Sequence, residues 1–179
     1  MRITAGYLRS RVINIPDLQG LRPTPAKVRQ ALFNILGTVD DMRLLDLFSG
    51  SGIMALEAIS RGAASVISIE QNRSLTRDMA VIRDAWDLTK RWQIKTALVE
   101  KGLALMAGQH FDLIFADPPY QQGFSEQLPL WLDQHEITCD RLIIEESKKV
   151  NPVWPAGWLC VQSRLYGDTC LHFLERKKS

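Results

Sequence analysis

From residue 42 onward, short apolar runs alternate with amphipathic segments along the sequence. Apolar runs bounded by turn residues indicate buried strands, and apolar residues spaced three and four apart indicate helices. The strands are predicted at Arg43–Phe48, Ser65–Glu70, Gln93–Ala97, Phe111–Ala116 and Arg141–Glu145. The helices between them are predicted at Ile53–Arg61, Arg73–Trp86, Glu100–Ala107 and Ser125–Gln134. Such alternation builds an α/β fold with a doubly wound, mostly parallel sheet covered by helices on both faces.

The C-terminal part of the sequence departs from this alternation. Trp158–Tyr166 and Thr169–Glu175 flank the dipeptide Gly167-Asp168. Two apolar runs around a turn of this kind predict an antiparallel hairpin, which would close the sheet.

The N-terminal part also differs from the rest. Residues 3–15 predict two short strands, and Thr24 and Pro25 predict the cap and the first residue of a helix. Apolar residues spaced three and four apart continue this helix until a glycine ends it: Val28, Ala31, Leu32, Ile35 and Gly37. We expect an N-terminal hairpin extension over residues 1–20 and one compact domain over residues 21–179.

The composition is that of a globular protein that needs no covalent staples. The 179 residues are 46% hydrophobic and 23% charged, which is ordinary for a chain that buries one core. The three cysteines show no paired spacing, and no apolar run is long enough to cross a membrane. Because the N-terminus does not resemble a signal peptide, we expect a cytoplasmic protein with reduced thiols and no membrane association.

The net charge of +2 conceals an uneven distribution. The first 35 residues carry six basic side chains against one acidic side chain, whereas the remaining 144 carry 16 basic and 19 acidic ones. A basic leading segment on a mildly acidic body suggests a polyanionic partner, although a solvated basic face would look the same. The candidate contacts are Arg9 and Arg11 in the hairpin, with Arg22 and Arg29 at the opening or on the polar side of the first helix.

The tetrapeptide Asp117-Pro118-Pro119-Tyr120 directly follows the fourth predicted strand. Proline has a fixed φ and no N–H, so the pair ends sheet pairing and stiffens the loop. The Asp117 carboxylate and the Pro118 carbonyl can then accept both hydrogens of one NH₂ group, and the Tyr120 ring offers a flat face to a flipped base. The pattern predicts a site for an exocyclic base amine; a proline-rich turn over a core tyrosine is the alternative.

Three further candidate groups follow other predicted strands. The loop Asp46-Leu-Phe-Ser-Gly50-Ser-Gly52 lets the backbone approach a ligand without a Cβ in the way. Asp46 could accept from a cationic amine, and Glu70 could accept both hydroxyls of a ribose. Glu100, near the end of the third strand, is the candidate for contact with an adenine ring.

The glycine loop by itself leaves two cofactors open. Gly50-Ser-Gly52-Ile-Met-Ala55 fits a dinucleotide fingerprint, with Glu70 following at a suitable distance, so a nicotinamide dinucleotide remains a competitor. The combination with Asp117–Tyr120 favours S-adenosylmethionine, because the activated methyl donor would lie beside a base amine and needs only positioning. The three histidines provide no obvious acid or base for hydride chemistry, and the histidines and cysteines show no metal-ligand spacing.

With these motifs the chain resembles a known family, the bacterial 16S rRNA guanine-N2 methyltransferases of the small ribosomal subunit. The resemblance covers nearly the whole length. Its most specific segment is residues 21–36, together with the loop at 46–52, Leu56-Glu57-Ala58, residues 60–63, Asp117–Tyr120 and residues 166–169. The chain departs from the family at Val99-Glu100-Lys101-Gly102, where the members compared tend to carry Asp or Asn followed by Ala.

The resemblance implies a Rossmann-like class I methyltransferase fold and N2-methylguanosine as the product. S-adenosylmethionine would be converted to S-adenosylhomocysteine without a metal. The residues implied for the guanine amine are Asp117, Pro118 and Tyr120. The residues implied for the cofactor are Asp46, Phe48, Gly50, Gly52 and Glu70, with Glu100 toward the adenine. The basic hairpin would contact 16S rRNA within an assembling small subunit, and we expect a monomer.

Besides the nicotinamide-dependent oxidoreductase that the glycine loop leaves open, two other functions stay open from the sequence. A DNA adenine-N6 or cytosine-N4 methyltransferase uses the same kind of tetrapeptide, but it usually needs an extra target-recognition region for which 179 residues leave no room. A non-catalytic RNA-binding assembly factor would keep the basic hairpin but would not require Asp117 and Tyr120.

Overall fold

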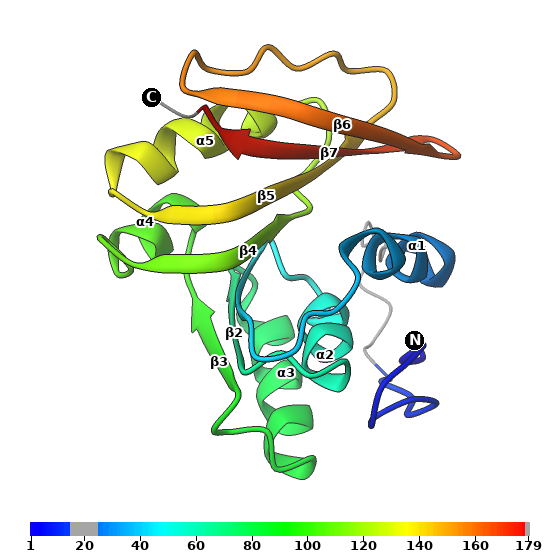
Figure 1. Ribbon diagram of the computed structural model, residues 1–179. Helices are drawn as coiled ribbons and strands as arrows, with labels where there is room; N and C mark the ends of the chain where they lie inside the picture. Colours follow the sequence, from blue (N-terminus) through cyan, green and yellow to red (C-terminus); the bar gives the residue numbers. More distant parts are fainter. Residues whose placement is uncertain (15–24, 178–179) are drawn as a thin grey trace.

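The computed structural model describes residues 1–14 and 25–177 and contains a mixed sheet ordered β3-β2-β1-β4-β5-β7-β6 (Figure 1). The strands are β1 Arg43–Leu47, β2 Ser65–Glu70, β3 Trp92–Thr96, β4 His110–Ala116, β5 Thr138–Ser147, β6 Trp158–Tyr166 and β7 Thr169–Arg176. The helices are α1 Ala26–Leu36, α2 Ile53–Ser60, α3 Arg73–Ala85, α4 Val99–Ala104 and α5 Phe124–Gln134. The predicted α/β class and the parallel order of the first five strands are confirmed.

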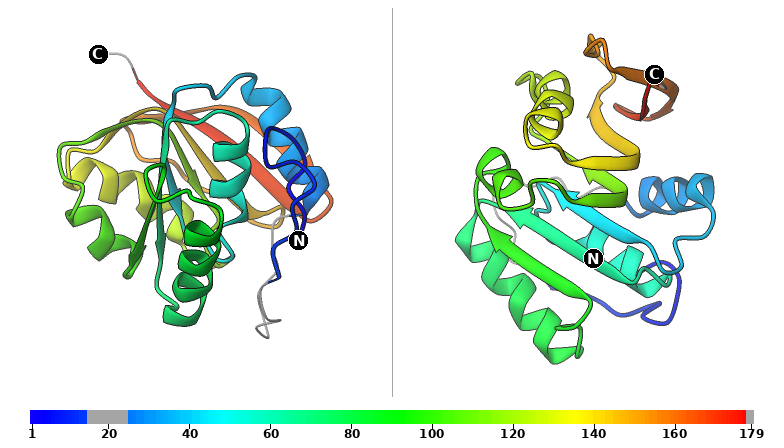
Figure 2. Two further views of the ribbon diagram at one scale, coloured as in Figure 1. Left: turned by 90° about the horizontal axis from the view of Figure 1, so that it is seen from below. Right: turned by 60° about the vertical axis from the view of Figure 1, so that its left-hand side comes forward.

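Two hydrophobic cores lie on the two faces of the sheet. One core joins the sheet to α1, α2 and α3, and the other joins it to α4 and α5. Figure 2 shows α1 and α2 on one side of the sheet and α4 and α5 on the other. Strands β1 and β4 alternate their apolar side chains between these cores, which is why Leu44 and Leu45 in β1 and residues 113–116 in β4 form continuous apolar runs.

The strand order reverses between β1 and β4, and this reversal positions the candidate site. Leu47 in β1 pairs with Ile69 in β2 and with Ala116 in β4, and Ala116 pairs with Ile144 in β5. The residues that directly follow these four paired positions therefore lie in one row across the sheet: Glu70, Phe48, Asp117 and Glu145. In open α/β sheets, ligands bind beyond the carboxyl ends of the strands at such a reversal.

The C-terminal hairpin is confirmed, with a pairing that the sequence did not reveal. Strand β7 lies between β5 and β6 and runs antiparallel to both. The turn at Gly167-Asp168 thereby reaches the carboxyl end of β5, where the Lys148 ammonium lies 2.7 Å from the Asp168 carboxylate.

The two short strands predicted between residues 3 and 15 are wrong within the described residues. Only a single antiparallel bridge, Arg2 to Val12, forms there. The backbone N–H groups at the tip of this segment bond to helix α2 instead of to a partner strand: Tyr7 donates to the Ser60 carbonyl at 2.9 Å, and Leu8 donates to the Ser60 hydroxyl at 2.9 Å. Residues 1–14, here called the N-terminal segment, bury Ile3, Leu8 and Ile13 in the same core as α2; the expected boundary at residue 20 lies outside the described residues.

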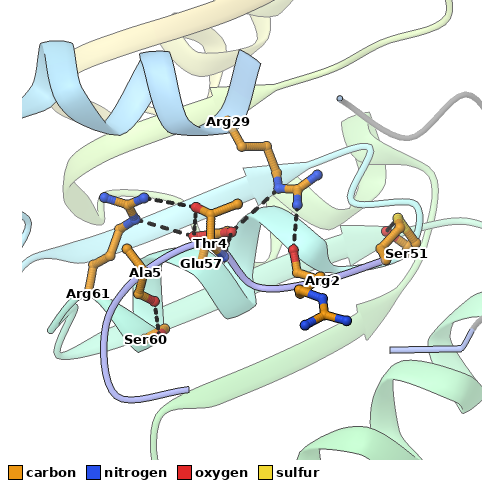
Figure 3. Close-up of polar contacts among 9 residues, drawn as sticks. Arg2, Thr4, Ala5, Arg29, Ser51, Glu57, Ser60 and Arg61 are labelled. Atoms are coloured by element: carbon orange, nitrogen blue, oxygen red, sulfur yellow. Dashed lines mark hydrogen bonds and ion pairs between the residues drawn. The ribbon is translucent and has the colours of Figure 1, made fainter. Parts of the chain in front are cut away.

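The buried carboxylate of Glu57 in α2 ties the N-terminal segment to the domain (Figure 3). It accepts from the Thr4 backbone N–H at 2.6 Å and from the Thr4 hydroxyl at 3.0 Å. The guanidinium groups of Arg29 and Arg61 approach it to 3.6 Å and 3.3 Å. Helix α1, helix α2 and the N-terminal segment therefore meet at one buried acid.

The predicted exposure of Arg29 is wrong. Arg29 is 2% exposed, and its guanidinium donates to the Arg2 carbonyl at 2.8 Å in addition to facing Glu57. Burial lowers the pKa of Arg29, and the Glu57 carboxylate partly offsets this effect. An arginine enclosed in this way is not offered to a polyanion.

Helix α1 begins one residue later than predicted. Pro25 precedes the helix with an extended backbone, and Ala26 is the first helical residue. The predicted cap Thr24 and the predicted contact Arg22 lie outside the described residues. Gly37 follows the helix with φ 74°, as expected for a helix end.

None of the described helices is long and apolar enough to span a lipid bilayer. The three cysteines are free, and burial raises the pKa of Cys139 to about 12.

Candidate active site

The glycine loop between β1 and α2 is held by the end of β2. Gly50 and Gly52 have φ values of 52° and 72°, a region that glycine enters without steric cost. The Gly50 N–H donates to the Glu70 carboxylate at 2.9 Å, and the Asn72 N–H donates to its other oxygen at 2.8 Å. The structure thus brings together three predicted cofactor residues, Gly50, Gly52 and Glu70.

A side chain at Gly52 would meet two buried residues. A Cβ there would lie 2.6 Å from the Trp92 ring and 2.7 Å from the Met79 sulfur. Both side chains are fully buried, so neither can move away easily.

We expect Gly52→Ala to lower the free energy of unfolding by about 2–5 kcal/mol, combining a left-handed backbone with overpacking. Gly108→Ala is the matched control, because Gly108 has the same φ of 72° and open space around it. That control should lose only about 1–2 kcal/mol. Urea unfolding of both variants measures the difference, and equal losses would contradict the packing argument.

Asp46 lies in a buried polar chain beneath the glycine loop. It is 3% exposed, and its carboxylate accepts from the Ser68 hydroxyl at 3.2 Å. Ser68 in turn accepts from the Trp92 indole N–H at 2.9 Å. Burial raises the pKa of Asp46 to about 7; the hydroxyls of Ser49 and Ser68 counteract this shift. A carboxylate so poorly solvated is suited to a cationic partner.

Phe48 adopts a left-handed backbone with φ 57°, which is uncommon for an aromatic residue. Its ring packs on Phe124 at a centroid distance of 5.3 Å. Such strain concentrates at functional sites. The bend turns the chain from β1 into the glycine loop beside Asp117.

The loop from Asp117 to Tyr120 begins directly beside the glycine loop. The Asp117 N–H donates to the Leu47 carbonyl at 3.3 Å, which joins the ends of β4 and β1. Asp117 is half-buried, Pro118 is buried and Pro119 is exposed. The predicted amine residues and the predicted cofactor residues therefore occupy adjacent loops at the strand reversal.

The Tyr120 hydroxyl is anchored to the far half of the sheet. It donates to the Glu145 carboxylate at 2.7 Å and lies 3.0 Å from the Thr169 hydroxyl. Burial, and then the Glu145 charge, raise the pKa of Tyr120 well above its ordinary value, so the phenol stays protonated. The ring is thus fixed in position by strands β5 and β7.

A second buried glutamate fixes the rest of this loop. Glu146 accepts from the Gln121 N–H at 3.2 Å and from the Ser125 hydroxyl at 2.8 Å. Gln121 has φ 62°, so a sharp turn is held by this carboxylate. Sequence reasoning missed Glu145, Glu146 and Thr169, although two adjacent acids at the end of an apolar strand were a visible signal.

Glu100 follows strand β3 and is exposed in the first turn of α4. Its adenine contact stays a prediction. Arg9 and Arg11 are exposed as predicted, and the Arg11 guanidinium lies 5.0 Å above the Trp86 ring at the end of α3.

One group of possible metal ligands lies at the opposite end of β4 from this site. His110, Asp112 and Asp140 place ligand atoms within 4.8 Å of one another. The Asp112 carboxylate already accepts from the Arg43 N–H at 2.6 Å, and exposed acidic groups of this kind are common.

Comparisons with known proteins identify the family of this chain. The model of the family described as conserved hypothetical protein 95 matches residues 1–175. The chain belongs to this family. Ribosomal RNA small subunit methyltransferase D of Escherichia coli strain K12 is 32% identical over 185 residues, covering 99% of this chain and 90% of the relative. The relative of the same name from Haemophilus influenzae is 28% identical, covering 93% of this chain and 89% of the relative.

Solved structures of methyltransferases share this fold. A protein of Escherichia coli assigned as a methyltransferase has a TM-score of 0.87 and 29% identity, covering 99% of this chain and 98% of that one. An RNA methyltransferase from Salinibacter ruber, solved with S-adenosyl-L-homocysteine, has a TM-score of 0.67 and 13% identity, covering 88% and 96%. The predicted resemblance to small-subunit rRNA methyltransferases is confirmed, and so is the Rossmann-like fold.

Proposed function

We propose that this protein transfers a methyl group from S-adenosylmethionine to the exocyclic N2 amine of a guanine in 16S rRNA. The observation that supports this most is that two loops lie side by side at the strand reversal. The glycine loop carries the proposed cofactor residues, and the loop Asp117–Tyr120 carries the proposed amine residues. The Asp117 N–H bonds to the Leu47 carbonyl, one residue before the bend into the glycine loop. Relatives named for small-subunit rRNA methylation support the choice of RNA.

The residues around the glycine loop fit the proposed cofactor. Gly50 and Gly52 leave the backbone free of Cβ atoms, and Glu70 retains lone pairs for ribose hydroxyls while holding the loop. The buried Asp46 carboxylate supplies the counter-charge for an ammonium group, directly or through water. S-adenosylmethionine supplies a methyl group already activated on a sulfonium, so the protein has to provide positioning rather than strong acid or base.

The amine loop would orient the nucleophile. The lone pair of a guanine amine is delocalised into the ring, which makes the nitrogen a poor nucleophile. The Asp117 carboxylate and the Pro118 carbonyl would accept hydrogen bonds from its two N–H groups and stabilise the positive charge that develops on nitrogen. The new N–C bond would form as the S–C bond of the donor breaks, S-adenosylhomocysteine would leave, and the nitrogen would release one proton to water. The anchored Tyr120 ring would stack on the flipped base. We place this reaction in the cytoplasm on an assembling small subunit, with the protein acting as a monomer.

Transfer of labelled methyl groups tests this function. Small subunits and naked 16S rRNA from cells lacking the protein are incubated with methyl-labelled S-adenosylmethionine, and the RNA is digested to nucleosides. We expect label in N2-methylguanosine. Label confined to added DNA would favour an amine of a DNA base, and rRNA binding without any transfer would favour an assembly factor.

We expect cofactor affinity to rise about tenfold from pH 6 to pH 8. Only the ionised Asp46 attracts the ammonium group, and with a pKa of about 7 its ionised fraction rises from about one tenth to about nine tenths. Calorimetric titration with S-adenosylhomocysteine, which carries the same ammonium group, measures this change.

Asp46→Asn should weaken cofactor binding and remove its pH dependence, whereas Asp140→Asn, far from the site, should retain both. A flat affinity profile in the unmodified protein would contradict the assignment of Asp46 to the ammonium group.

A further inference from the structure

A basic groove runs along the outer flank of helix α3, beside the edge strand β3. Its lining contains three arginines and no acidic residue: Arg73, Thr76, Arg77, Ala80, Arg83, Ile94 and Thr96. Strand β3 pairs only with β2, so no further described strand covers the groove. The hydroxyls of Thr76 and Thr96 bond to each other at 2.8 Å and fix helix and strand at the floor.

Two of the arginines lack partners in the described part of the chain. Arg73 and Arg77 form no ion pair there, whereas Arg83 pairs with Asp84 at 2.8 Å. The positions of these two positive charges destabilise the protein when no anion is bound. Arg73 occupies the first turn of α3, where the helix dipole disfavours cations, and the first turn holds no acid. Arg77 repeats the like charge one turn later.

Helix α3, which forms one side of the groove, has further basic side chains near its C-terminal end. At the far end of α3, the Arg11 guanidinium stacks on Trp86, and the Arg91 guanidinium lies 5.7 Å from the Tyr7 ring. At its near end, Arg73 follows Glu70 by three residues, so the groove begins beside the candidate cofactor site. Arginines therefore lie along the groove and also beside the C-terminal end of α3, with Arg83 paired to Asp84 between them.

We infer that this groove binds backbone phosphates of the same rRNA that delivers the target guanine. The inference rests on the proposed function and extends the RNA surface beyond Arg9 and Arg11. Guanidinium groups suit phosphate oxygens because their fork of N–H donors can bind two oxygens at once. A helix rise of 1.5 Å per residue separates Arg73 from Arg77 by about 6 Å and Arg77 from Arg83 by about 9 Å, so successive positions along one strand can be contacted.

The test replaces Arg73 and Arg77 together with glutamine and measures binding of 16S rRNA over a range of salt concentrations. Loss of two phosphate contacts should reduce the slope of log affinity against log salt by about 1.4, and affinity at 0.15 M salt should fall about tenfold. Cofactor affinity should stay unchanged, and Tm should stay equal or rise, because two unfavourably placed cations are removed. A structural role would instead lower Tm.

The control removes the same charge elsewhere, with Lys101→Gln and Arg164→Gln, both exposed and outside the groove. It should keep the full salt slope. A second comparison, Arg9→Gln with Arg11→Gln, should lower the slope independently of the groove variant.

If the unaltered protein methylates rRNA and the groove variant keeps its slope, the groove inference fails and the proposed function stands. If the unaltered protein neither binds nor methylates rRNA, both fail.

Discussion

Replacing Asp117 with alanine should reduce methyl transfer by about 10²–10⁴-fold and leave cofactor affinity within about twofold. The carboxylate is assigned to the amine, and removing one positioned acceptor of developing charge typically has an effect of this size. The variant should fold normally, because Asp117 is half-buried and lies near the acidic Glu145 anchor of Tyr120. Single-turnover transfer and calorimetric cofactor titration together measure the two expectations.

Asp117→Asn provides a sharper version of this experiment. The amide keeps the shape of the side chain and one carbonyl acceptor for the amine but removes the negative charge, so transfer should fall less than in Asp117→Ala. Asp140→Ala removes an exposed acid outside the site and serves as the control. Transfer near the original rate in Asp117→Ala would remove the carboxylate from the mechanism.

Replacing Glu57 with alanine should lower the free energy of unfolding by about 3–5 kcal/mol. The variant leaves the guanidinium of Arg29 buried without its counter-charge, and it also removes the acceptor for both donors of Thr4. Burial already lowers the pKa of Arg29, and Glu57 is the group that counteracts this effect. Urea unfolding at pH 7.5 measures the loss.

Two further variants show how much of this effect belongs to the buried pair. Arg61→Ala should lose much less, because its side chain remains partly accessible to solvent. The double variant Glu57→Ala with Arg29→Leu should recover part of the stability, since it removes the unpaired charge. Limited proteolysis should also cut the N-terminal segment faster in Glu57→Ala. A loss below 1 kcal/mol would contradict the central role of Glu57.

The sequence predicted the parts of this protein that depend on local pattern. Strands β1 and β4 contain apolar runs because both of their faces are covered, and the carboxyl ends of such strands meet at one edge of a parallel sheet. The proximity of Asp46, Glu70 and Asp117 was therefore predictable from the sequence. The hairpin of β6 and β7 was equally visible from its turn.

Partners distant in sequence could not be read in this way. Helix α1 buries Val28, Arg29, Leu32 and Phe33, so its inward stripe includes an arginine that the apolar spacing assigned to the polar face. Only the acid at position 57, on another helix, makes that burial possible. In the same way, the contacts of Tyr120 depend on β7 lying beside β5. A hairpin pattern in the sequence does not specify which of its two strands pairs with the rest of the sheet.

The insertion of β7 between β5 and β6 also sets an order of events during protein synthesis. Strand β6 is made first, yet its only neighbour in the described sheet is β7, which also carries the Thr169 hydroxyl that contacts Tyr120. The ribosome reaches residue 169 about 2–10 s after residue 120, at about 5–20 residues per second. During that interval the amine loop exists without one of its anchors. We therefore expect a nascent chain to acquire its finished active site only when the last strand of the sheet has been inserted.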